Sequence, residues 1–157
     1  LSTDDKAYAF PLDYQVYWNF DDWNDINDAL ADLIEAKKPK IIVHNKVFEN
    51  LWSRFILEVD SFMDECTMIR QHVLDHRRRT KSLKYQIFRR WGIWGYDAAM
   101  DRFIKSPDSN SMNKMDEAPL DDQLLYVGLD AYMTMKLHRE QECRLGDSSL
   151  EVFGNVE

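Results

Sequence analysis

Two short stretches of this sequence carry carboxylates beside other polar side chains at spacings that could support chemistry. The first, 44–49, reads His-Asn-Lys-Val-Phe-Glu, and the second, 126–130, reads Tyr-Val-Gly-Leu-Asp. On a helix, a separation of four residues places Tyr126 and Asp130 on one face, with their Cβ atoms about 5–6 Å apart. A phenol at that distance can donate a hydrogen bond to the carboxylate or to a nucleophilic water. An aspartate in an apolar helix is costly to bury unless it is paired or binds a metal.

The first stretch stands where a short apolar run meets a helical pattern. Open α/β sheets place ligand sites outside the carboxyl ends of their strands, so Glu49 is well placed for one. A structural interpretation is also open, in which Asn45 caps the helix and Glu49 favours its positive end. Tyr126 and Asp130 can likewise be a core-edge tyrosine beside a surface aspartate. Each stretch alone fits the structural interpretation better, and only the two together favour chemistry.

Basic residues gather between Arg70 and Arg90, although the chain as a whole is acidic. Eight lysines and arginines stand there against one acid, Asp75. Contacts from this region to backbone phosphates would make nucleic-acid binding sensitive to salt. A solvated loop between helices explains the same residues at least as well. The candidate phosphate contacts are Arg77, Arg78 and Arg79.

Two further groups have a chemical and a structural interpretation. His72 and His76 lie one helical turn apart and would make half a zinc site with Cys66 as a nearby thiol, although this spacing is a weak signal. An aromatic cluster offers either a platform for stacking bases or, as the better explanation, core and loop packing. That cluster is Trp91, Trp94 and Tyr96.

Length and composition limit the class of protein. The chain has 157 residues, of which 45% are hydrophobic and 13% aromatic, enough for one well-filled domain. A net charge of −8 argues against a protein that coats nucleic acid by bulk attraction. No apolar run approaches a membrane span. Cys66 and Cys143 are expected to be reduced core thiols, which indicates an intracellular, cytoplasmic protein.

The elements that must position these residues follow from periodicity and turn residues. We expect a helix capped by Asp21 or Asp22 that ends before Pro39, and a last helix that begins near Pro119 and ends at Gly146. That last helix should bury one apolar stripe, and residues 143–157 could form a flexible tail. The order of elements predicts an α/β domain with a mixed sheet. The expected strands are 7–10, 15–20 and 40–44, with a brief extended piece near 62–63. Further helices are expected after Asn45 and over 67–75 and 83–91, and a loop is expected at 106–119. The expected apolar stripe of the last helix is Leu120, Leu124, Val127, Ala131 and Met135.

Together, the two polar stretches resemble the motifs of the DEDDy 3′→5′ exonucleases, a branch of the DnaQ-like, RNase H-like fold. The second motif of that family reads His-Asn-x-x-Phe/Tyr-Asp after a strand, as at His44–Glu49, and the third reads Tyr-x-x-x-Asp on a late helix, as at Tyr126–Asp130. The text between them is similar to the proofreading domain of phage family A DNA polymerases. The matching segments are Cys-Thr-Met at 66–68, Leu-Asp at 74–75, Ser-Leu-Lys at 82–84, Leu-Asp-Asp at 120–122 and Gly-Leu-Asp-Ala at 128–131.

The resemblance implies a mixed sheet flanked by helices and a single exonuclease domain over residues 1–157. It also implies hydrolysis of the 3′-terminal phosphodiester of DNA with two divalent ions, Mg²⁺ or Mn²⁺. In that scheme Asp130 is a direct metal ligand, Tyr126 orients the attacking water, and Glu49 holds the second metal. Asn45 and His44 shape the site around the substrate.

Two features depart from the family pattern. Glu49 stands where the family usually has aspartate, so its carboxylate reaches one methylene further. The family's first motif, Asp-x-Glu on the first strand, is absent from this chain, and Asp4-Asp5 and Asp64-Glu65 stand in the wrong places for it. The domain is therefore expected to be incomplete at its N-terminal side, to lack its first strand and to hold metals weakly.

Three functions remain open at this point. The first is a proofreading exonuclease that acts on single-stranded DNA 3′ ends, joined to a polymerase domain in a phage or its bacterial host. The second keeps the fold and changes the substrate to RNA, as in RNase D-like ribonucleases. The third is a catalytically inactive module that binds nucleic acid or serves structure. A sheet without its central strand would also favour self-association through the exposed edge.

Overall fold

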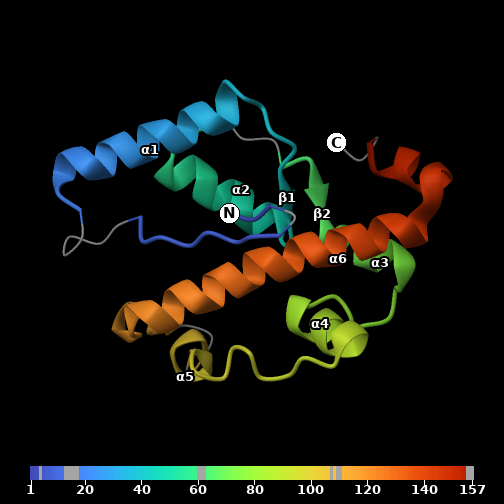
Figure 1. The fold of residues 1–157 in the computed structure, drawn as a ribbon. Coiled ribbons are helices and arrows are strands. Elements are labelled where there is room, and N and C mark those ends of the chain that lie inside the picture. Colours follow the sequence, from blue (N-terminus) through green and yellow to red (C-terminus); the bar gives the residue numbers. More distant parts are fainter. Residues whose placement is uncertain (4, 13–17, 60–62, 107, 109–110, 155–157) are drawn as a thin grey trace. The chain divides into compact units, whose positions relative to one another are not determined.

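The computed structural model describes residues 1–3, 5–12, 18–59, 63–106, 108 and 111–154 (Figure 1). The chain forms two compact units. Unit 1 comprises Leu1–Phe10 and Ser82–Leu137, and unit 2 comprises Pro11–Lys81 and His138–Glu157. The elements in chain order are α1 (Phe20–Glu35), β1 (Ile42–Val43), α2 (Lys46–Ile56), β2 (Glu65–Cys66), α3 (Thr67–Leu74), α4 (Leu83–Trp91), α5 (Asp101–Ile104), the 3₁₀ helix η1 (Met115–Glu117) and α6 (Leu120–Gly154).

The strands of unit 2 confirm the α/β class but give a smaller sheet than expected. β1 and β2 pair in parallel, with Ile42 opposite Glu65 and Val43 opposite Cys66. Within the described ranges this two-stranded pair is the whole sheet. The strand expected at 40–44 is therefore real but shorter, and only half-buried. The brief extended piece expected near 62–63 appears slightly later as β2, while residue 62 lies outside the described residues.

The first expected N-terminal strand is not found, and most of the second falls outside the described residues. At 7–10 there is only an isolated antiparallel bridge between Ser2 and Ala7, in unit 1. Residues 15–17 lie outside the described part of the chain, and Phe20 already begins α1 rather than ending a strand. The start of α1 at Phe20 is explained by its cap. Asn19 is a strong N-cap residue, and it starts the helix immediately after Trp18.

Helix α1 begins directly after its cap, Asn19, which forms a reciprocal pair with Asp22. The Asn19 side chain accepts a hydrogen bond from the Asp22 backbone N–H at 2.9 Å, and the Asp22 carboxylate accepts one from the Asn19 N–H at 3.4 Å. Such a capping box satisfies two backbone donors at the helix start. The expected cap at Asp21 or Asp22 was wrong, because Asp22 acts as the third helical residue of the box. The helix ends at Glu35, before Pro39, as predicted.

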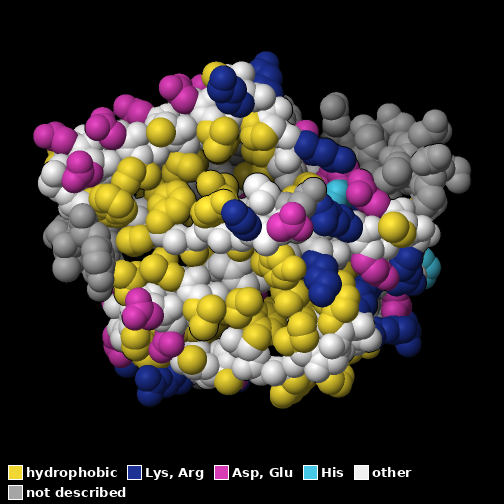
Figure 2. Space-filling model, viewed as in Figure 1, with side chains coloured by type: hydrophobic (Ala, Val, Ile, Leu, Met, Phe, Trp, Pro, Cys, Tyr) yellow, Lys and Arg dark blue, Asp and Glu magenta, His cyan; other side chains and the backbone are white. Residues whose placement is uncertain are grey.

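Helix α2 begins at the predicted Asn45 cap and leaves its apolar face uncovered. The Asn45 Oδ1 accepts a hydrogen bond from the Phe48 N–H. Hydrophobic side chains are exposed over α1 and α2 in Figure 2, while acidic side chains line an edge of α1. The exposed apolar side chains of α2 are Val47, Phe48, Leu51, Trp52 and Phe55.

Unit 1 packs around α4 and the first half of α6. α4 has the predicted bounds, with Ser82 as its cap and Gly92 ending it in a left-handed conformation at φ 66°. Glycine is favoured there because it lacks the Cβ that makes positive φ costly. The central cluster joins residues of α4 to residues of α6. Its buried members are Leu83, Ile87, Met133 and Leu137.

Helix α6 runs past the point where the sequence predicted its end. It continues through Gly146 to Gly154. A single glycine in a helix costs only about 1 kcal/mol relative to alanine, so neighbouring helical residues carry the helix across it. Residues 143–154 are therefore helical, and 155–157 lie outside the described residues. Both cysteines are free, but only Cys66 is the buried thiol expected, because Cys143 is exposed on α6.

The buried face of α6 also differs from the expected stripe. Val127 is 48% exposed, and the other four members of that stripe are only partly buried. The fully buried face is rotated and lies further along the helix. It comprises Met133, Thr134, Leu137, His138, Gln141 and Leu145. Because three of these residues are polar, a search for apolar periodicity selects the wrong face.

No helix in the described part of the chain combines the length and apolarity needed to cross a lipid bilayer.

The corrected face of α6 predicts which leucines hold unit 1 together. Leu137 is fully buried and Leu125, on the same helix, is 62% exposed. Leu137→Ala should lower the free energy of unfolding by about 2–5 kcal/mol, because it opens a cavity in the central cluster. Leu125→Ala should change it by less than about 0.5 kcal/mol. Urea denaturation followed by circular dichroism measures both, and equal losses would mean that the assigned face is wrong.

Candidate functional site

The predicted pair Tyr126 and Asp130 lies in unit 1 with a second tyrosine beside it. The Tyr96 hydroxyl donates a hydrogen bond of 2.6 Å to Asp130 Oδ1. The rings of Tyr96 and Tyr126 stack, with centroids 6.5 Å apart and planes 20° apart. Tyr96 comes from the loop after α4, and the other two residues come from consecutive turns of α6. The arrangement is a carboxylate on a helix, faced by two phenols.

Burial and hydrogen bonding act in opposite directions on this carboxylate. Burial raises the pKa of Asp130, while the hydrogen bonds of Tyr96 and Tyr126 and the charge of Lys84 lower it in part. Burial together with the Asp130 charge raises the pKa of both phenols above their usual value. Both tyrosines therefore remain neutral hydrogen-bond donors at physiological pH. A carboxylate that is poorly compensated by its surroundings gains from a nearby cation.

Lys84 supplies a cation to this site and is already shared with other carboxylates. Its ammonium forms an ion pair with Asp97 and lies 3.9 Å from Asp101 Oδ1. It also lies 5.9 Å from the centre of the Tyr126 ring. Sequence reasoning did not select Asp97 or Asp101. Their separation of four residues was the available signal, but it fell in a segment without clear periodicity.

Aromatic residues next to this site divide into packed and exposed ones. Trp91 and Tyr96 pack against the central cluster of unit 1, and the Lys136 ammonium lies 4.7 Å from the Trp91 ring centre. Trp94 is 80% exposed and meets Phe88 edge-on at 5.2 Å. The packing interpretation thus describes Trp91 and Tyr96, and the exposed aromatic surface of this region is Phe88 with Trp94.

The second predicted stretch lies in unit 2, where His44 and Asn45 have structural roles. His44 Nδ1 is 2.9 Å from Thr67 Oγ1, and the Thr67 hydroxyl also reaches the Val43 carbonyl at 3.2 Å. Cys66 Sγ donates to the His44 carbonyl at 3.2 Å. These contacts tie β1 to the start of α3. Burial lowers the pKa of His44 to about 4, against a partial rise from the Lys81 backbone, so the imidazole is neutral.

Glu49 stands on the first turn of α2 and is half-buried. Asn45 is engaged as the cap of the same helix. Glu49 and Asp130 belong to different units, so neither unit by itself brings the two predicted metal ligands together. The residues of the Tyr126–Asp130 motif lie close together within unit 1. The carboxylate of the His44–Glu49 motif, Glu49, lies in unit 2.

The basic stretch of unit 2 is exposed but not uniformly available. Arg77 binds Asp75 through Nε at 2.9 Å and Nη2 at 2.6 Å, and its backbone N–H donates to the same carboxylate. Such a two-pronged pair orients the guanidinium. Arg78 and Arg79 are exposed, and Arg79 has a positive φ of 63° that ends the turn. The three arginines therefore differ in how they could meet a phosphate, because the Arg77 guanidinium is already paired with Asp75.

The half zinc site that His72, His76 and Cys66 weakly suggested is not assembled. His76 Nδ1 contacts the His72 carbonyl at 3.1 Å, and the two rings lie 6.1 Å apart. Cys66 is occupied by its contact with His44. Across the described residues, the group of side chains close enough to share a metal ion contains none of these three.

Comparisons of the chain with protein-family models, with curated proteins and with solved structures found no match.

The low pKa of His44 predicts a specific pH dependence of stability. The unfolded imidazole titrates near 6.5 and the folded one near 4, so the unfolded chain binds the proton first. The contribution is therefore complete above about pH 6.5 and is lost as the pH falls toward 4, by about 3 kcal/mol.

Urea denaturation at pH 7.5 and pH 4.5 tests this expectation. His44→Asn should be less pH-dependent over that interval than the unchanged chain. His72→Asn, a change at an exposed histidine, should retain the full dependence. An equal pH dependence in all three chains would contradict the assignment of the titration to His44.

The contact between Tyr96 and Asp130 makes a second prediction. Tyr96→Phe removes a donor that favours the charged carboxylate, so the pKa of Asp130 should rise further. Carbon-13 NMR of the aspartate carboxyl groups measures this directly. Tyr8→Phe, at a residue that is 54% exposed, is the control and should leave the value unchanged. A fall in the Asp130 pKa in Tyr96→Phe would show that the hydrogen bond does not favour the carboxylate.

Proposed function

We propose that this chain is the 3′→5′ exonuclease domain of a DNA polymerase, with an RNase H-like fold, that hydrolyses the 3′-terminal phosphodiester of single-stranded DNA. The observation that carries the proposal is the Tyr126–Asp130 pair on α6, in which a half-buried carboxylate of raised pKa faces neutral phenols. That pair reproduces the Tyr-x-x-x-Asp motif in residue type, spacing and helical setting. The His-Asn-x-x-Phe-Glu stretch at a strand-to-helix junction is the second support.

The residues present fit a divalent ion of the Mg²⁺ or Mn²⁺ class. Asp130 is an oxygen ligand whose burial is only partly compensated, and Glu49 offers a second carboxylate. These ions prefer oxygen ligands and make up a small protein set with water. When bound, a pair of such ions supplies the activated hydroxide and the charge stabilisation for phosphodiester hydrolysis. The proposal assigns Asp130 and Glu49 of this chain to the ions, and the two residues belong to different units.

The chain's own residues have separate tasks in this proposal. Tyr126 keeps its proton at working pH and orients the attacking water as a donor. Tyr96 holds the Asp130 carboxylate in place through a hydrogen bond of 2.6 Å. Phe88 and the exposed Trp94 offer a surface on which the terminal bases can stack. Arg78 and Arg79 are suited to backbone phosphates, which they would contact without reading sequence.

A second candidate function is binding of single-stranded nucleic acid without cleavage. The exposed Phe88–Trp94 pair favours it, because aromatic stacking needs no metal and accepts any base. The division of Asp130 and Glu49 between two units is compatible with this role as well. The two functions differ in one measurable respect, which is metal-dependent shortening of the strand.

The test is degradation of a 5′-labelled single-stranded DNA in the presence of Mn²⁺. The unchanged chain should produce a ladder of shortened products, and Asp130→Asn should reduce the rate by more than about 100-fold, because a metal ligand supplies several kcal/mol. Asp121→Asn is the matched control, since it removes an exposed carboxylate from the same helix. This control should degrade the strand at the unchanged rate.

Each other outcome has a defined meaning. Cleavage that survives in Asp130→Asn would remove Asp130 from the site and sink the proposal. DNA binding without any ladder, in a folded chain, would establish the binding module instead. Faster turnover of an RNA strand of the same sequence would assign the chain to the RNase D-like branch.

A further inference from the structure

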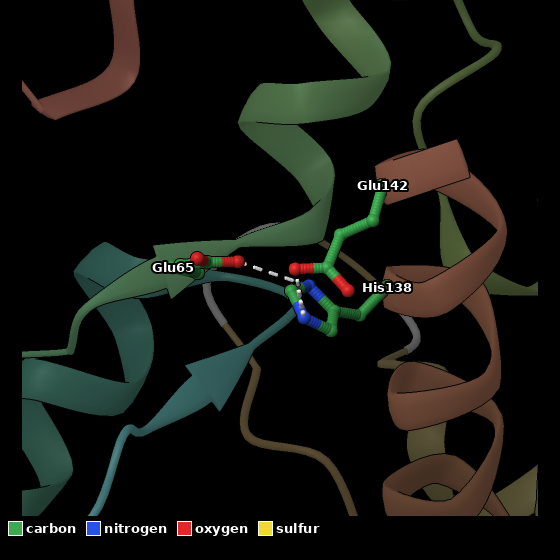
Figure 3. Close-up of side chains that lie close together, drawn as sticks. All are labelled: Glu65, His138 and Glu142. Atoms are coloured by element: carbon green, nitrogen blue, oxygen red, sulfur yellow. Dashed lines mark ion pairs between the residues drawn. The ribbon is translucent and has the colours of Figure 1, made fainter. Parts of the chain in front are cut away.

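Unit 2 contains a histidine enclosed by two carboxylates. Glu65 lies on β2, while His138 and Glu142 lie one turn apart on α6 (Figure 3). His138 Nδ1 is 3.0 Å from Glu65 Oε2, and Nε2 is 3.3 Å from Glu142 Oε1. One ligand atom from each residue lies within 4.8 Å of the others. The three side chains thus converge on one point from a strand and a helix.

This arrangement leaves the imidazole with a nitrogen that nothing satisfies. A neutral imidazole has one N–H, so it can donate to only one of the two carboxylates. The other nitrogen then directs its lone pair at a carboxylate oxygen. His138 is only 4% exposed, and its Nδ1 is buried without a hydrogen-bond partner among the described residues. A cation between the ring and the carboxylates would remove this conflict.

A buried cation already stands beside Glu65. Arg70 is 2% exposed and forms an ion pair with Glu65 Oε2. A neutral imidazole is the form that binds metals.

Lys40 marks the position that a cation takes between the two carboxylates. Its Nζ lies 2.5 Å from Glu65 Oε1 and 3.9 Å from Glu142 Oε1. The lysine side chain is 55% exposed, so it can leave for water at little cost. Arg70 is buried and would stay, holding the second oxygen of Glu65 as outer partners of metal ligands commonly do.

We propose that Glu65, His138 and Glu142 form a binding site for a transition-metal dication, best suited to Zn²⁺, which takes the place of the Lys40 ammonium. Zinc accepts mixed nitrogen and oxygen ligands at about 2.0–2.2 Å, and three protein ligands leave a fourth position for water. Mg²⁺ is a poorer match because it prefers oxygen ligands alone. The site is separate from Asp130, and it does not rest on the proposed exonuclease function.

Binding would join β2 to α6 within unit 2. Because the three ligands meet only in the folded chain, the metal should raise the stability of the fold by mass action. A site of this kind serves stability or metal sensing without taking part in cleavage of a strand.

Isothermal titration with Zn²⁺ at pH 7.5, using the full chain, tests the proposal. The unchanged chain should bind one ion, and Glu142→Gln should bind it at least about tenfold more weakly, which is about 1.4 kcal/mol. Lys40→Met should bind about tenfold more tightly, because the competing ammonium is gone. Tighter Zn²⁺ binding by Lys40→Met would distinguish a metal site from a purely structural network of ion pairs. Loss of the lysine could only weaken such a network.

Two control variants assign the bound ion to this site. His72→Gln breaks the exposed pair of His72, on α3, and His76, which follows that helix. Asp130→Asn removes the proposed catalytic carboxylate. Both should bind Zn²⁺ as the unchanged chain does. Cobalt(II) added to Lys40→Met should give the visible absorption of a nitrogen- and oxygen-ligated ion, and His138→Asn should abolish it.

The proposal is overturned if the unchanged chain binds no Zn²⁺ at millimolar concentration, or if Lys40→Met binds no more tightly. Loss of binding in His72→Gln would move the ion to the surface histidines, and loss in Asp130→Asn would move it to the proposed exonuclease site. The Glu142 side chain is half-exposed, so its replacement by glutamine should leave the fold intact. Circular dichroism of Glu142→Gln before the titration checks this.

Discussion

Helix α6 supplies buried side chains to both compact units, and this requirement governs most of what surrounds it. Near its middle it places Met133 and Leu137 in the apolar cluster of unit 1. Its next turns place His138 and Gln141 inside unit 2, where the Gln141 amide donates to the Thr67 carbonyl at 3.0 Å. Burying polar groups on one face is tolerable only when each finds a partner. The residues that β2 and α3 present to α6 are therefore partners for hydrogen bonds and charges.

The half-buried carboxylates of Asp130 and Glu65 are stabilised against the cost of burial in two different ways. Asp130 in unit 1 is faced by neutral phenols, which lower its pKa without cancelling the effect of burial. Glu65 in unit 2 is faced by the cations of Arg70 and Lys40. The first arrangement leaves a net negative site, which suits a catalytic dication. The second holds cations already, and a metal enters it only by exchange with the exposed lysine.

These differences give the two proposals different physical grounds. The exonuclease proposal rests on motif order along the chain together with the local geometry of Tyr126 and Asp130. The zinc proposal rests on one unsatisfied imidazole between carboxylates, and no motif points to it. A chain can hold both, because hard oxygen sites and mixed nitrogen and oxygen sites select different ions.

Local sequence was sufficient for features that depend on neighbouring residues. The Asn45 cap, the bounds of α4 and the end of α1 before Pro39 follow from caps, periodicity and proline sterics. The Tyr126–Asp130 pair follows from helical spacing for the same reason. Features that depend on distant partners could not be read in this way. The third residue of the Asp130 site, Tyr96, is 34 positions away, and Glu65 is 73 positions from His138.

The buried face of α6 shows where this limit comes from. An apolar stripe can be read from the order of residues, but it does not show that Gln141 is buried with its amide donating to the Thr67 carbonyl, or that His138 is buried between Glu65 and Glu142. Whether a polar residue is inside depends on its hydrogen bonds and ion pairs, and these exist only after folding. Residue order thus determined the helix starts and the spacing of the candidate catalytic pair. Tertiary structure alone decided which polar groups are buried, because burial free energy depends on contacts between distant segments.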